Sequence, residues 1–171
     1  MADFTLIVIA RAIHIVAGIA WAGSAFTLGF VVVPLATKHA SEGAGRWFGL
    51  IAARAAIMQA VAAVLTITTG VGIFYALHAQ DASTGGLLLK SGSLAAILAL
   101  LLGVFVGRPT GRRLAHLQSS STAEGKPSDQ MIQELAVLRR RATITSRLAV
   151  ALIGFATLAM ALFRYASTIA S

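Results

Sequence analysis

The sequence predicts an all-α integral membrane protein, an up-down-up-down bundle of four helices with both termini on the outer side. Hydrophobic residues make up 57% of the 171 residues and charged residues only 12%, whereas soluble domains carry about 25% charged residues. The apolar residues form four runs of roughly the 20 residues that cross a bilayer as a helix. The basic residues gather in two of the three connections, and this bias predicts the orientation.

We expect one domain over residues 1–171, with its helices at about residues 5–36, 55–77, 87–106 and 130–166. Only helices or closed barrels satisfy every backbone polar group in lipid, and the chain shows no ten-residue alternation typical of barrel strands. Each run is therefore predicted to be a helix.

The first two runs have clear limits. No charge lies between Arg11 and Lys38, so the first run can cross the bilayer, and Pro34 indicates its end. The second run ends at His78, on the outer side.

The third and fourth runs differ in their flanks. Lys90 lies near the start of the third run. The segment 107–129 is expected to be a cytoplasmic linker, because its second half is polar and rich in serine. Ser128 or Asp129 is expected to cap the helix that follows, whose first turns form a cytoplasmic extension of the fourth span.

Charge assigns the sides of the membrane. The first connection, at about 37–54, carries three Lys and Arg residues. The second, at about 78–86, carries none, and the third, at about 107–147, carries eight. The positive-inside rule places the first and third in the cytoplasm. The net charge of +8 thus indicates topology, and no nucleic-acid partner is expected. The chain has no cysteine, which excludes disulfides and thiolate metal sites.

His14 is the first candidate functional residue, because a histidine within a spanning segment is costly unless it has a partner. Three interpretations remain open. His14 ligates a metal or haem, relays protons, or is a structural histidine bonded to a neighbouring helix or close to the interface.

Lys90 and His78 are the candidate partners of His14, since both are expected in the same half of the membrane. A buried lysine shifts toward its neutral form and can then ligate a metal, but Lys90 can also extend to the interface. Arg54 and Arg147, near the cytoplasmic ends of helices two and four, either bind a phosphate or propionate or anchor at lipid head groups.

Five short motifs carry a resemblance to a known group. Residues 10–15 place a basic residue three positions before a histidine, and Trp-Ala-Gly follows at 21–23. Thr-Gly stands at 69–70, Gly-Leu-Leu-Leu-Lys at 86–90 and a basic helix exit at 107–113. Together these resemble the CopD/HemJ-like superfamily of small four-helix bacterial membrane proteins. The long segment after the third helix and the motif-free fourth helix depart from that pattern.

The resemblance implies a multi-pass protein of the bacterial inner membrane that binds haem b. His14 and Lys90 match a histidine and a lysine that, in the HemJ-like proteins, are linked to haem binding and porphyrinogen oxidation. Copper is the alternative cofactor, since CopD-like proteins are linked to copper handling. The expected function is then haem-based electron transfer, or redox chemistry on a porphyrin or quinone by a haem-dependent oxidoreductase.

Two other functions remain open. One is copper handling or transport. The other is a non-catalytic subunit of a homo-oligomer or a larger membrane complex, because stripes of small residues let helices dock closely. Those stripes are Gly18, Ala22, Ala25 and Gly29 on the first helix, and Ala95, Ala99 and Gly103 on the third.

Overall fold

The computed structural model describes residues 2–38, 45–123 and 128–169. Every regular element in these ranges is a helix, which confirms the all-α prediction. Four of the helical segments are long and apolar enough to cross a membrane, as the four runs predicted.

The first span is one continuous helical rod. It consists of α1 (Ala2–Thr27), a π-helical turn η1 (Leu28–Val32) and α2 (Val33–Lys38). Pro34 lies within this rod, directly after η1, where it lacks an N–H to donate, and the helix continues past it to Lys38. The rod therefore covers the expected helix at 5–36 and extends beyond it at both ends.

The second span, α3 (Gly45–Leu77), starts earlier than expected. The sequence predicts a helix from about residue 55 and a connection over 37–54. The structure shortens this connection from both sides, and its residues 39–44 lie outside the described ranges.

The third span continues into the segment that was expected to be a linker. Helix α4 (Thr84–Leu102) passes through a π-helical turn η2 (Gly103–Gly107) into α5 (Arg108–Ala123). The linker predicted over 107–129 is thus helical as far as Ala123, and residues 124–127 lie outside the described part of the chain. The polar sequence of α5 forms a helix because one side of it, with Thr110 and Leu117, is buried against the bundle.

The fourth span, α6 (Asp129–Ile169), agrees closely with the predicted 130–166. The backbone N–H of Met131 donates to the Ser128 hydroxyl at 3.3 Å, so Ser128 provides the expected cap. With 41 residues at 1.5 Å each, α6 is about 62 Å long. About half of it therefore extends beyond a hydrocarbon core of about 30 Å.

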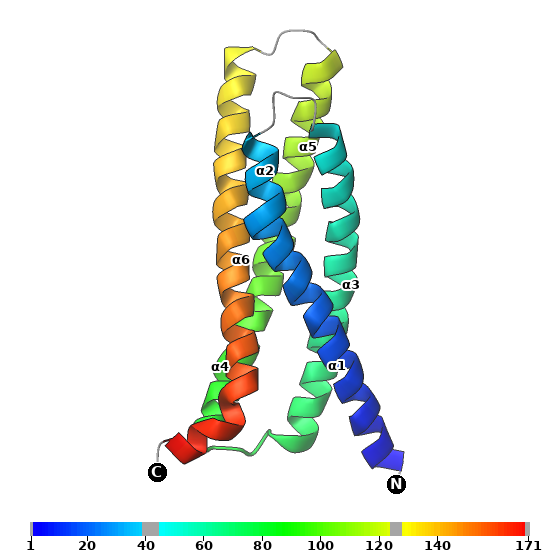
Figure 1. Ribbon diagram of the computed structural model, residues 1–171, viewed down its shortest axis with the longest axis vertical. Helices are drawn as coiled ribbons and strands as arrows, with labels where there is room; N and C mark the ends of the chain where they lie inside the picture. Colours follow the sequence, from blue (N-terminus) through cyan, green and yellow to red (C-terminus); the bar gives the residue numbers. More distant parts are fainter. Residues whose placement is uncertain (1, 39–44, 124–127, 170–171) are drawn as a thin grey trace.

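The helices associate as two pairs, α1 with α3 and α4 with α6, while α5 packs on α6 (Figure 1). Both termini lie at the same end of the molecule, which we call the terminal end. The opposite end, which holds α2, the start of α3, α5 and the start of α6, is called the basic end. At the basic end, Nε of Arg113 on α5 lies 2.8 Å from Oε1 of Glu134 on α6.

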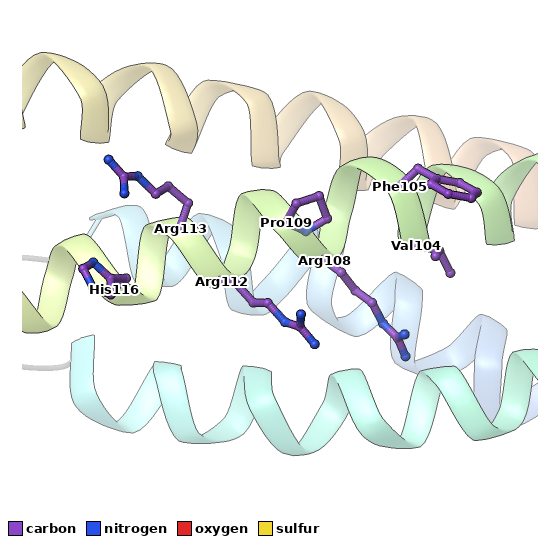
Figure 2. A pocket seen from close by; sticks show the side chains of 7 residues that line it. All are labelled: Val104, Phe105, Arg108, Pro109, Arg112, Arg113 and His116. Carbon is purple, nitrogen blue, oxygen red and sulfur yellow. The ribbon is translucent and has the colours of Figure 1, made fainter.

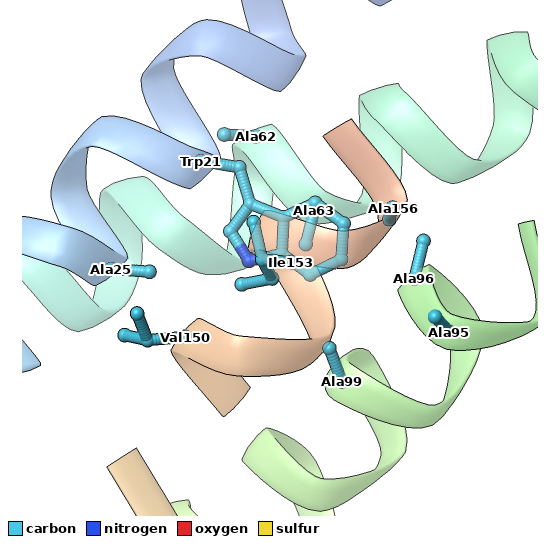
Figure 3. Packing of buried hydrophobic residues seen from close by; sticks show 10 residues of the cluster. All are labelled: Trp21, Ala25, Ala62, Ala63, Ala95, Ala96, Ala99, Val150, Ile153 and Ala156. Atoms are coloured by element: carbon cyan, nitrogen blue, oxygen red, sulfur yellow. The ribbon is translucent and has the colours of Figure 1, made fainter. Parts of the chain in front are cut away.

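The core joins the two pairs around one large side chain (Figure 3). The indole of Trp21 lies among small and aliphatic residues of all four spans: Ala25, Ala62, Ala63, Ala95, Ala96, Ala99, Val150, Ile153 and Ala156. Small side chains allow the backbones to approach closely, as in other membrane bundles. Ala25, Ala95 and Ala99, assigned above to docking of another subunit, are therefore used within the chain.

Large apolar side chains cover the outside of all four spans. Phe4, Ile19, Leu94, Phe105 and Leu158 are each more than half exposed. A soluble monomer rarely exposes contiguous apolar surface of this extent. The fold is thus that of a multi-pass membrane protein with its apolar surface toward lipid.

Candidate functional site

His14 lies on the face of α1 that packs against α3. Its Nδ1 is 2.8 Å from the backbone oxygen of Thr66 and 3.5 Å from the Thr69 hydroxyl. A carbonyl oxygen only accepts, so Nδ1 carries the hydrogen and donates it. In the neutral ring, Nε2 then keeps its lone pair. The interaction joins two helices and also leaves one nitrogen able to bind a metal.

Gly70 leaves the space beside α3 that the His14 ring occupies. A Cβ added at Gly70 would lie 2.8 Å from Cε1 of His14, closer than Cβ atoms normally approach, and 3.1 Å from Nδ1, a tight contact. A larger residue at position 70 would therefore force the His14 ring to shift from this position against α3. The Thr-Gly pair at 69–70 contributes a hydroxyl near Nδ1 and the space for the ring.

Lys90 is held at the connection between α3 and α4. Its Nζ donates to the backbone oxygen of Asp81 at 2.7 Å. The carboxylate of Asp81 accepts from the Ser83 backbone N–H at 2.9 Å, and the Ser83 hydroxyl accepts from the Gly86 N–H at 3.1 Å. Lys90 thus stabilises the start of α4 at the terminal end.

His78 packs against α6. Its ring stands edge-on to the Phe163 ring of α6, with centroids 5.3 Å apart and an interplanar angle of 82°. Across the described ranges, no hydrogen bond joins His14 to Lys90 or His78. Nor does that part of the chain contain a group of three or more His, Cys, Asp or Glu residues able to hold a metal. The two predicted partners of His14 therefore stay predictions.

Asp81 makes the connection sensitive to acid. The hydrogen bonds from Ser83 lower the pKa of the Asp81 carboxyl below its ordinary value of 3.8, with smaller contributions from the charges of His78 and Lys90. A lowered pKa means that the charged form stabilises the fold above pH 3.8, and that this stabilisation is lost as the pH falls through the lowered pKa. The carboxyl carbon shift of Asp81 in an NMR titration should have its midpoint below 3.8, and a midpoint at or above 3.8 would contradict the arrangement.

Arg54 and Arg147 are exposed residues of α3 and α6. In the described part of the chain neither forms an ion pair. Twelve residues of helix, about 18 Å, separate Arg54 from Thr66. Arg54 therefore lies far along α3 from His14, whereas Arg11 lies one turn from His14 on α1 and is exposed.

Arg108 and Arg112 were not among the predicted site residues. Arg108 and Arg112 follow the π-helical turn η2, and their side chains extend toward α3 (Figure 2). The sequence placed them in a basic connection and in the basic helix exit at 107–113, but not in a binding site. Their spacing of four residues, directly after an apolar run, is the signal that could have identified them as one face of a helix.

Comparisons with known protein families, with curated proteins and with solved structures find no match. The candidate site must therefore be interpreted from its own geometry.

Proposed function

We propose that this multi-pass membrane protein binds haem b through Nε2 of His14 and transfers electrons. The observation that carries the proposal is the hydrogen bond of 2.8 Å between Nδ1 of His14 and the Thr66 carbonyl. Metal-bound histidines almost always donate their other ring N–H to a carbonyl, a carboxylate or water, which fixes the tautomer and the ring orientation. The choice of haem rests on the resemblance of residues 10–15, 21–23 and 86–90.

Among the described residues, His14 would supply one ligand to a haem iron. His14 supplies a neutral imidazole, Thr66 orients it, and Gly70 leaves room for the ring. Lys90 would have to release the Asp81 carbonyl, and His78 would have to leave Phe163, to become a second ligand. The proposal therefore takes His14 as the single protein ligand. Arg11, one turn away, is the nearest cation along α1 for a propionate.

Haem iron supplies one-electron chemistry when bound. The chain keeps the His14 imidazole in place, because the Thr66 carbonyl accepts its hydrogen bond and Gly70 leaves space for the ring. A single imidazole favours haem over copper, because the described residues offer no cluster of further metal ligands. Oxidation of a porphyrinogen or a quinol is the enzymatic form of the same proposal.

An absorption spectrum tests the proposal directly. The full chain, purified in mild detergent from haem-replete cells, should show a Soret band that shifts when dithionite reduces the iron. Folded protein without such a band would overturn the proposal. Copper analysis of the same sample distinguishes the alternative cofactor.

We also propose that the basic end faces the cytoplasm of a bacterial cell and the terminal end faces outward, because Lys and Arg favour the cytoplasmic side. The chain has no cysteine, so single cysteines can report the orientation. Ala82→Cys lies at the exposed connection of the terminal end, and Ser119→Cys lies on exposed α5. In intact cells made permeable only at the outer membrane, an impermeant maleimide should label Ala82→Cys and spare Ser119→Cys. The reverse labelling would contradict the orientation.

A further inference from the structure

The two helix pairs leave a crevice between α3 and the rod formed by α4, η2 and α5. Helices α3 and α4 touch little, because α3 packs mainly on α1 and α4 on α6. The crevice has a volume of about 140 Å³. Its lining is mostly apolar, with the Trp21 indole, alanine, valine and leucine side chains and Gly103. The Gln59 amide and the Arg108 guanidinium are its polar groups.

The crevice opens at the basic end onto a wider groove along η2 and α5. Val104 and Arg108 line both the crevice and the groove, so the two are continuous. The groove also includes Arg112, one helical turn from Arg108. An apolar crevice thus ends at a pair of guanidinium groups.

These two guanidinium groups have no acidic neighbour in the described structure. Arg113 turns toward α6 and pairs with Glu134 at 2.8 Å, whereas Arg108 and Arg112 extend toward α3 (Figure 2). Helix α3 contains no Asp or Glu, and neither do α4, η2 and α5. Two arginines on one face, without an acidic neighbour among the described residues, can bind a phosphate by charge-assisted hydrogen bonds.

The π-helical turn η2 brings the arginines to this face. The backbone N–H of Arg108 donates to the oxygen of Gly103, five residues earlier. The wider turn advances the side chains that follow relative to an ideal α-helix, and such turns frequently occur at functional sites. Gly103 also lines the crevice, and a Cβ added there would meet no atom within 4 Å. The crevice is therefore open at this position.

We propose that this crevice and groove bind one anionic phospholipid. Its phosphate lies between Arg108 and Arg112, and an acyl chain enters the crevice beside Trp21 and Gly103. The apolar lining matches a hydrocarbon chain, and the unpaired positive charge matches the head group. Basic pockets between spanning helices bind such head groups in other membrane proteins.

Trp21 provides the measurement, because it lines the crevice. The chain has two tryptophans, so Trp47→Phe leaves Trp21 as the only one. The full chain with this substitution is placed in nanodiscs of phosphatidylcholine. Phosphatidylglycerol or phosphatidylcholine with brominated acyl chains is then titrated in, and the quenching of Trp21 is recorded. With about 1 kcal/mol for each arginine, half-maximal quenching should need about thirtyfold less of the anionic lipid.

Matched variants test the two parts of the site. Arg108→Gln with Arg112→Gln should abolish the preference for the anionic lipid. Arg140→Gln with Arg141→Gln removes the same charge from exposed positions on α6. This variant should retain the preference for the anionic lipid. Gly103→Leu fills the crevice and should reduce quenching by both lipids. Gly72→Leu, at another glycine with open space around it, should not.

Three results would overturn the proposal. The first is equal quenching by the two brominated lipids. The second is an anionic preference that survives the Arg108 and Arg112 substitutions. The third is relief of quenching by millimolar inorganic phosphate, since the site would then recognise free phosphate instead of a lipid. The haem spectrum is recorded on the same samples, so failure of the lipid proposal is distinguishable from failure of the haem proposal.

Discussion

Replacing His14 with asparagine should abolish the Soret band and leave the fold in place. The asparagine Nδ2 occupies nearly the position of the histidine Nδ1, so it can still donate to the Thr66 carbonyl that lies 2.8 Å away in the native chain. The substitution removes Nε2, the only ring nitrogen that is able to bind iron in this tautomer. Absorption spectra report the haem, and circular dichroism reports the helices.

Three further variants make the assignment specific. His78→Asn should retain the full band, because the His78 ring is packed against Phe163. His14→Ala should lose the band and also the interhelical hydrogen bond, so it should be less stable than His14→Asn. Lys90→Gln should leave the iron spin state unchanged if His14 is the single ligand. A band that survives His14→Asn and disappears in His78→Asn would assign the iron to His78 instead.

Replacing Gly92 with leucine should lower the free energy of unfolding by about 3 kcal/mol, at the upper end of typical overpacking effects. Gly92 lies where α4 crosses α6. A Cβ added there would be 2.7 Å from the Ala159 Cβ and 3.4 Å from the Ala156 oxygen. The two helices must therefore separate, which removes close packing along the more extensive of the two pairs. Reversible unfolding in mixed micelles measures the change.

Gly23→Leu is the control for this prediction. Gly23 is exposed on α1, and a Cβ there meets no atom within 4 Å. The same substitution should therefore leave the stability almost unchanged. Equal losses for Gly92 and Gly23 would show that the effect comes from the leucine side chain in the micelle and not from the contact between α4 and α6.

Hydrophobic runs predicted the spans because lipid permits only helices over such lengths. The same criterion underestimated the helices at the basic end. Residues 45–54 and 108–123 are polar or mixed, so no apolar run indicates them. Helix α5 is stabilised by packing on the next helix, α6, with Leu117 buried and Arg113 paired with Glu134. Tertiary packing of this kind overrides a weak local preference.

The sequence predicted His14 as a site residue, but it did not predict which atoms His14 contacts. His14 is conspicuous as a histidine in an apolar helix. Its acceptor is the backbone oxygen of Thr66, and a backbone group leaves no mark in the sequence. Arg108 and Arg112 extend toward α3 after the π-helical turn at 103–107 (Figure 2), and a period of 3.6 residues does not anticipate that turn.

The pairing of α1 with α3 and of α4 with α6 also bears on how the protein is made. Residues 2–77 already contain both helices of the first pair and both partners of the hydrogen bond between His14 and Thr66. Chains fold from the N-terminus during synthesis, so this hairpin can close in the membrane before Thr84 leaves the ribosome. The second hairpin, α4 with α6, then packs against the first and covers Trp21. The contact pattern therefore favours biogenesis by two successive hairpin insertions.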